Sequence, residues 1–294
     1  MQSRLEKLFR YSVGLLALLV VASLAFVIFF VIKEALPLFK EVGLGDFLFG
    51  SRWMPIAYAG EASFGISNFI LATLYVSLLG MIIAAAVGIG AAVFLSCVVG
   101  EKMRALLYPF IDLLAGIPSV IYGFIGLVVL VKLFMKLGVH TGSCVLAAAI
   151  LLSIMLFPYI ISSCSETILK AKDKYLAASN AMGIDRWHAI ATVILPASWG
   201  NILLSMILAI GRAMGETMAV MMVIGNANLL PTLLGKSETI AAVIALEMGT
   251  AEAGSLHYNA LYAAGLVLMI LLFIINAVIA ALRSRLMRGN ENEE

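Results

Sequence analysis

Six stretches of the chain are apolar for long enough to cross a membrane as helices. These runs cover about residues 11–32, 66–99, 105–135, 143–163, 199–224 and 259–282. A helix needs roughly 20 mostly apolar residues to cross the hydrocarbon core of a bilayer, and a helix satisfies its own backbone there. The pattern therefore predicts an all-α integral membrane protein with about six transmembrane helices.

The second and third runs are longer than one span requires. Each is expected to be tilted or to continue into the aqueous phase. In the third run, Pro118 follows Gly116 and should kink or interrupt the helix. Such breaks are tolerated where they border a cavity, so Ser119 and Tyr122 could offer hydroxyls to a pathway. A simple packing kink is an equally good interpretation.

Small residues crowd the second run. They are Gly80, Ala84, Ala85, Ala86, Gly88, Gly90, Ala91 and Ala92. Small side chains let the backbones of neighbouring helices approach closely, so this run is expected to pack tightly against another span.

Basic residues are distributed unevenly between the connections, which predicts the orientation. With the amino end inside, the inner segments hold Arg4, Lys7, Arg10, Lys102, Arg104, Lys170, Lys172, Lys174, Arg186, Arg283, Arg285 and Arg288, and the outer segments hold Lys33, Lys40, Arg52, Lys132, Lys136 and Lys236. Cytoplasmic loops carry the excess of Lys and Arg, so both termini are expected in the cytoplasm.

The amino-acid composition indicates that most of the chain is in contact with membrane lipid or with other buried helices. The chain has 294 residues, of which 63% are hydrophobic and 12% charged. Its net charge of only +2 gives no indication of a nucleic-acid partner. Three units are expected: a first span with its external segment (1–65), a core (66–282) and a cytoplasmic tail (283–294).

The inner connection at about 164–198 has the pattern of a compact knob. Its first part is expected to be a short helix that ends at Gly183, and Asp185 is placed to cap a second short helix. An ordinary amphipathic loop is the alternative.

This connection resembles the EAA loop of ABC importer permeases, whose pattern is Glu-Ala-Ala, three residues, Gly, nine residues, Ile, one residue, Leu-Pro. Gly183, Leu195 and Pro196 are in register, and Val193 replaces the isoleucine. The segment Ala177-Ala178-Ser179 stands where Glu-Ala-Ala would be, so the glutamate is missing. The resemblance implies that the knob inserts into a groove on an ATPase subunit.

Two charges, Arg212 and Glu216, lie within the fifth run. Each costs on the order of 3 kcal/mol at the bilayer centre, so both should face a partner or an aqueous path. Their i,i+4 spacing in a continuous helix places both on one face and allows mutual pairing. Gly211 and Gly215 leave the backbone beside them bare, which suits close packing or a ligand. An internal salt bridge that only holds helices together is the alternative.

The segments Gly211-Arg-Ala-Met-Gly-Glu-Thr217-Met-Ala219 and Gly116-Ile-Pro-Ser-Val-Ile-Tyr-Gly-Phe124 resemble the PstC-type permeases of phosphate-specific ABC importers. With the knob, the resemblance covers roughly residues 65–282. It implies a type I ABC importer permease fold and a phosphate path that needs Arg212 and Glu216. One hypothesis is that Glu216 holds Arg212 when the path is empty and yields it to phosphate.

The resemblance also implies a place in the cytoplasmic (inner) membrane of a prokaryote, and it implies the partners. They are a related second permease, two copies of an ATPase subunit that bind ATP and Mg, and an external phosphate-binding protein. This chain itself is expected to be no enzyme and to bind no cofactor, because the segment that ends like a P-loop at Gly235-Lys236-Ser237 has Leu230 where the motif's first glycine would fall. No metal is expected either, because its histidines and cysteines do not have metal-ligand spacing. Two interpretations compete with this one: a permease for another oxyanion such as sulfate or molybdate, and an unrelated membrane enzyme or structural membrane subunit.

Overall fold

The computed structural model describes residues 2–56 and 62–291. The amino-terminal part contains α1 (Gln2–Ala35), α2 (Leu38–Glu41), α3 (Leu44–Phe49) and the antiparallel strands β1 (Trp53–Met54) and β2 (Ser63–Phe64). The core continues with α4 (Ser67–Val93), α5 (Glu101–Gly116), α6 (Ser119–Ile125), α7 (Lys132–Lys136), α8 (Val145–Ala181), α9 (Arg186–Ala189), α10 (Leu195–Met214), α11 (Met218–Ile224), α12 (Ile240–Glu247) and α13 (Leu256–Glu291). Three π-helical turns, η1 (Phe94–Val98), η2 (Gly126–Val131) and η3 (Ile190–Ile194), continue α4, α6 and α9.

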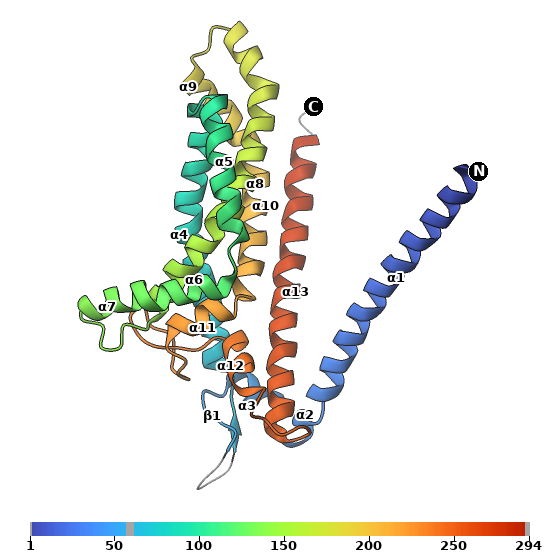
Figure 1. Ribbon diagram of the computed structural model, residues 1–294, viewed down its shortest axis with the longest axis vertical. Helices are drawn as coiled ribbons and strands as arrows, with labels where there is room; N and C mark the ends of the chain where they lie inside the picture. The colour runs from blue at the N-terminus through green and yellow to red at the C-terminus, as the bar shows by residue number, and fades with distance from the viewer. Residues whose placement is uncertain (1, 57–61, 292–294) are drawn as a thin grey trace.

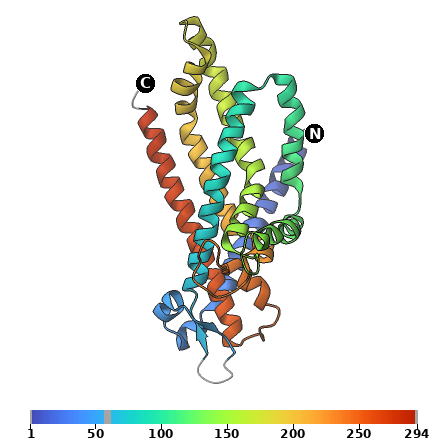
Figure 2. The same ribbon diagram turned by 90° about the vertical axis from the view of Figure 1, so that its left-hand side faces the viewer.

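The described part of the chain has six helical segments that are long and apolar enough to cross a membrane. The all-α membrane class is therefore confirmed, with one short strand pair as an addition. Helices α1, α4, α5, α8, α10 and α13 run along the long axis of the molecule (Figure 1). The amino end of α1, the carboxyl end of α13 and the short α9 lie toward the same end in both views (Figure 2).

The predicted interruption of the third run at Pro118 is confirmed, so residues 105–135 do not form one helix. Helix α5 ends at Gly116, Ile117 and Pro118 are extended, and α6 starts at Ser119. Proline favours an extended residue before it and can begin a new helix, which explains the break. Helix α6, η2 and α7 then run across the long axis instead of along it (Figures 1 and 2).

The prediction of one helix over 199–224 is wrong. Helix α10 begins earlier, at Leu195, and ends at Met214, with Gly215 as its C-cap. The short helix α11 starts separately at Met218 and packs against α6 and α8. Arg212 therefore lies in the last turn of a helix, and Glu216 lies beyond its end.

The inner connection is not a pair of short helices. Helix α8 continues from the bilayer to Ala181 without a break, and α9, η3 and α10 form one continuous helical run from Arg186 to Met214. The knob is thus the protruding ends of two long helices joined by residues 182–185. It is more rigidly connected to the core than a separate loop would be.

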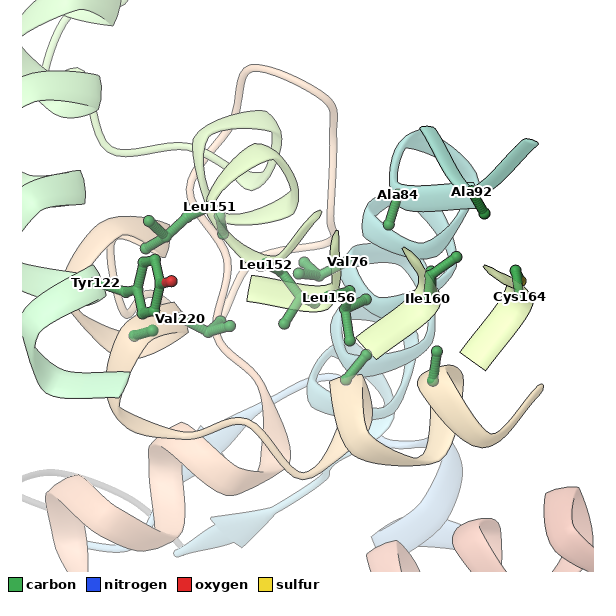
Figure 3. Packing of buried hydrophobic residues seen from close by; sticks show 14 of the residues in the cluster. Val76, Ala84, Ala92, Tyr122, Leu151, Leu152, Leu156, Ile160, Cys164 and Val220 are labelled. Carbon is green, nitrogen blue, oxygen red and sulfur yellow. The ribbon is translucent and has the colours of Figure 1, made fainter. Parts of the chain in front are cut away.

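The main core lies between α4, α8 and α10, and small residues allow the close approach. In Figure 3, Ala84 and Ala92 of α4 face Ile160 and Cys164 of α8. A Cβ placed on Gly88 would lie 2.8 Å from Ile160 Cγ2. Tight packing of the second span is therefore confirmed.

A second core joins the segment 35–69 to the carboxyl-terminal part. Its fully buried residues include Leu38, Phe47, Phe69, Ile240 and Leu261. At its edge, Glu247 Oε2 accepts from Trp53 Nε1 at 2.9 Å and lies 2.7 Å from His257 Nε2. These contacts tie β1, α12 and α13 together at the end opposite α9.

Candidate functional site

A cavity of about 360 Å³, the central cavity, opens between α5, α8 and α10, near the carboxyl ends of α5 and α10. Its lining residues are Ala115, Met155, Pro158, Tyr159, Ser162, Ser163, Glu166 and Arg212. The volume falls within the range of about 300–1,000 Å³ that small-molecule sites occupy.

One face of α8 supplies most of the lining. Met155, Tyr159, Ser162 and Glu166 recur at intervals of three or four residues, which is the spacing of one helical face. Pro158, on the same face, has no N–H to donate to the carbonyl four residues earlier, so a backbone acceptor is freed beside the cavity. The wall thus offers hydroxyl groups and a main-chain carbonyl within apolar surroundings.

Two serines connect the helices at this wall. Ser163 Oγ and Ser205 Oγ lie 2.6 Å apart and share a hydrogen bond between α8 and α10. Ser205 is buried, and its hydroxyl also lies 3.0 Å from the Asn201 carbonyl oxygen. This bond fixes the two helices relative to each other beside the cavity.

Arg212 supplies the positive charge of the cavity. Its side chain is exposed within this chain and forms no hydrogen bond or ion pair with any described residue. Glu166, the acidic residue of the lining, pairs with Lys170 Nζ at 2.7 Å. The guanidinium therefore keeps its donors available for a ligand, and its planar fork suits an oxyanion.

Glu216 does not share a helical face with Arg212, because the helix ends between them. No ion pair joins the two residues in the described structure, so the mutual pairing that an i,i+4 spacing allows is absent from this conformation. Instead, Glu216 Oε1 accepts from Ala219 N at 3.3 Å in the first turn of α11. Thr217 donates its hydroxyl to the Gly215 carbonyl at 3.2 Å, within the same break.

The two glycines beside Arg212 face open space. A Cβ on Gly211 would meet nothing within 4 Å, and one on Gly215 would meet only the carbonyls of α10 at 3.7 Å or more. They are therefore not used for close packing within this chain. The bare backbone is left for a ligand or for another subunit.

Ser119 and Tyr122 do not line the cavity. Tyr122 is buried, and its hydroxyl donates to the Leu114 carbonyl at 2.9 Å. That bond spans the break between α5 and α6. The packing interpretation is therefore correct for Tyr122, and Ser119 only begins α6.

The lining residues Tyr159, Ser162, Ser163 and Glu166 were not predicted. The pair Ser162-Ser163 followed by Glu166 was a usable signal, because polar residues interrupt an apolar run there. These residues are about 50 positions from Arg212 in the sequence, so the sequence did not show that they line the same cavity.

The knob is closed by a Schellman motif around Gly183. Gly183 has φ +74°, Gly183 N donates to the Asn180 carbonyl and Ile184 N donates to the Ser179 carbonyl, both at 3.0 Å. These bonds satisfy the last carbonyls of α8. Asp185 then accepts from Trp187 N and His188 N, so both predicted caps, Gly183 and Asp185, are confirmed.

The other matched positions of the loop lie on both sides of this turn. Ala177 and Ala178 are exposed near the end of α8, whereas Ser179 is buried and donates its hydroxyl to the Tyr175 carbonyl. On the return, Val193 lies in η3, and Leu195 and Pro196 begin α10. A proline removes one backbone hydrogen bond and crowds the preceding turn, which accounts for the π-helical turn before Pro196.

Two cations attach the knob to the end of α4. Lys172 Nζ donates to the Ser96 carbonyl at 2.8 Å, and Arg186 donates to the Cys97 carbonyl. Positive groups are favourable at the carboxyl end of a helix, where unpaired carbonyls gather. The knob is thereby connected to α4 as well as to α8 and α10.

A helical membrane bundle with a cationic cavity and a rigid projecting knob is the architecture of a transport permease. The family model described as "Binding-protein-dependent transport system inner membrane component" matches residues 84–288. A probable ABC transporter permease, YqgH of Bacillus subtilis, is 35% identical over 272 residues, which span 91% of this chain and 87% of that relative.

Two further relatives bear the name "Phosphate transport system permease protein PstC". The one from Xylella fastidiosa is 33% identical over 94% of this chain and 91% of its own length. The one from Haemophilus influenzae is 32% identical over 97% of this chain and 94% of its own length. The chain therefore belongs to the inner-membrane permeases of binding-protein-dependent transport systems, and among them to the PstC-type family.

A solved structure of the MetNI methionine ABC transporter in an inward-facing conformation has the same fold. The TM-score is 0.59 at 16% identity, and the match covers 75% of this chain and 95% of that chain. The expected type I ABC importer permease fold is confirmed.

Proposed function

We propose that this chain forms one half of the translocation path of an ATP-driven phosphate importer. The observation that carries the proposal is the central cavity, where Arg212 has no protein partner in the described structure and faces the hydroxyl-bearing face of α8. Arginine and hydroxyl groups are the donors that a tetrahedral oxyanion requires. The relatives named for phosphate transport support the same substrate.

The path is completed by a second permease. Arg212 and Gly211 are open toward the outside of this chain, and α5 has no buried residue although it borders the cavity. A charged group facing hydrocarbon would be costly, so a related chain covers this side and encloses the cavity.

The end that carries α9 faces the cytoplasm. The basic residues around the knob lie at this end, together with the amino end of α1 and the carboxyl end of α13. The excess of Lys and Arg on one side is the mark of the cytoplasmic face. The second core at the opposite end then meets the external phosphate-binding protein.

The knob transmits the action of two ATPase subunits, which hold the ATP and Mg of the complex. Met182 and Trp187 at its tip are 70% and 58% exposed, so they offer apolar surface to a partner. Because α8 and α10 are continuous with the knob, its displacement moves both walls of the cavity. The missing glutamate at Ala177 leaves shape and apolar contact as the basis of docking.

Glu216 limits how tightly the anion is held. In the described conformation Glu216 caps α11 and leaves Arg212 free. A conformation in which Glu216 reaches Arg212 would compete with phosphate and favour its release, since a path must bind its ion weakly enough to let it leave.

Competition separates this function from the alternative of a sulfate or molybdate permease. Uptake of labelled phosphate is measured in cells or proteoliposomes that contain the complete complex, with each unlabelled anion in excess. Only unlabelled phosphate should suppress the uptake. Equal suppression by sulfate or molybdate would contradict phosphate as the substrate.

A further inference from the structure

A second charged pocket lies at the base of the knob, separate from the central cavity. It has a volume of about 400 Å³ and is formed by the turn after α4, the first turn of α5, α8 and α9. Its lining residues are Val98, Val99, Gly100, Glu101, Arg104, Leu169, Lys172, Asp173 and Arg186. None of them lines the cavity around Arg212.

Three cations meet at this pocket, and their donors are only partly used. Lys172 and Arg186 each donate to one main-chain carbonyl, although lysine has three donors and arginine five. Arg104 is half-buried, and its side chain has no hydrogen bond or ion pair within the described chain. The carboxylates Glu101 and Asp173 line the same pocket but form no ion pair with these cations.

We propose that this pocket binds one phosphate group, with Arg104, Lys172 and Arg186 as its ligands. A phosphate oxyanion accepts several charge-assisted hydrogen bonds at once, which three converging cations can supply. Val98, Val99 and Leu169 form an apolar wall beside them. This combination favours the headgroup of an anionic phospholipid, because basic pockets between spans at the cytoplasmic surface bind such headgroups. Free inorganic phosphate has the same binding chemistry and is the other source.

The location gives the bound group a role. It would contact α5 through Arg104, α8 through Lys172 and α9 through Arg186, so it would hold these three elements together. The assignment to the cytoplasmic surface rests on the proposed orientation, whereas the cluster of cations does not.

Binding is tested on the purified complex with native mass spectrometry and with thermal unfolding. The variants are Arg104→Gln and Lys172→Gln, and the matched control is Lys102→Gln, which removes the same charge from the first turn of α5 outside the pocket. All are made in an Arg212→Gln background, so that phosphate in the central cavity does not contribute and a failure of the transport proposal remains distinguishable.

For the lipid source, the complex is placed in bilayers of phosphatidylcholine with added phosphatidylglycerol. One retained phosphatidylglycerol is expected in the control, with roughly fivefold weaker binding in Arg104→Gln, as expected for the loss of one basic residue. For the free source, inorganic phosphate is titrated in pure phosphatidylcholine, and a rise in unfolding temperature that both pocket variants lose would assign the pocket to it. Equal lipid retention and equal response to phosphate in all three variants would overturn the proposal.

Discussion

The hydroxyl oxygens of Ser163 and Ser205 lie 2.6 Å apart, so α8 and α10 are joined at the wall of the central cavity. The same two helices meet a second time at the knob, where residues 182–185 connect them. Under the proposed function, the helices that contact the ATPase are therefore the helices that line the cavity. Displacement at one junction reaches the other through rigid elements.

Removal of this junction should destabilise the bundle. In Ser205→Ala the bond between helices is lost, and we expect the free energy of unfolding to fall by about 1 kcal/mol. Ser198→Ala is the matched control, because the Ser198 hydroxyl donates only to the Ile194 carbonyl of its own helix. Thermal unfolding of the purified chain measures both, and equal effects would contradict a specific role for the Ser163 contact.

Gly88 and Gly90 form a matched pair on α4. A Cβ on Gly88 would lie 2.8 Å from Ile160 Cγ2, whereas one on Gly90 would meet nothing within 4 Å. Gly88→Ala should therefore cost about 1–3 kcal/mol through overpacking. Gly90→Ala should be neutral or stabilising by up to about 1 kcal/mol, because alanine favours a helix. Unfolding in detergent or nanodiscs tests the pair, and the reverse order would show that α4 does not approach α8 here.

The sequence predicted the number of membrane spans and the two caps of the knob, because the length of an apolar run and the identity of a capping residue can be read from neighbouring residues alone. It did not predict the end of α10, since an apolar run continues past Gly215 and run length alone cannot show a helix stop. Glycine can pack a helix or end it, and tertiary contacts decide which. The relation of Arg212 to Tyr159 and Ser162 depends on how α8 and α10 pack, so it was visible only in the structure.

The turn at Gly183 should be sensitive to any side chain. At φ +74°, an L-residue is strained by about 1–2 kcal/mol, although space is open around the position. We expect this strain to deform the knob, so Gly183→Ala should weaken ATPase association by roughly 5–30-fold. Gly200→Ala, at an open position of α10, is the control. Co-purification of the ATPase measures both variants, and normal recovery with Gly183→Ala would contradict this docking geometry.

Ionisation of Glu238 should make the region around the second core less stable as the pH rises. The side chain is 7% exposed, and burial, together with the charge of Glu247, raises its pKa to about 7 from 4.5. A raised pKa means that the folded state holds the proton more tightly than the unfolded state. The stabilisation is complete below pH 4.5 and is lost as the pH rises through about 7.

Glu238→Gln should remove this dependence, and Glu252→Gln, an exposed external residue, should retain it. Hydrogen exchange in α12 at pH 5 and pH 8 measures the local stability. If the pH dependence of exchange were unchanged in Glu238→Gln, a titratable group other than Glu238 would be its cause.

The central claim is that Arg212 binds phosphate during its passage, and uptake by Arg212→Gln tests it most directly. Glutamine keeps hydrogen-bonding capacity but removes the charge and the planar fork that pair with an oxyanion. In proteoliposomes that contain the assembled complex and the external binding protein, labelled phosphate uptake should fall to background while ATP hydrolysis continues. Uptake at the unaltered rate by the assembled variant would contradict the account.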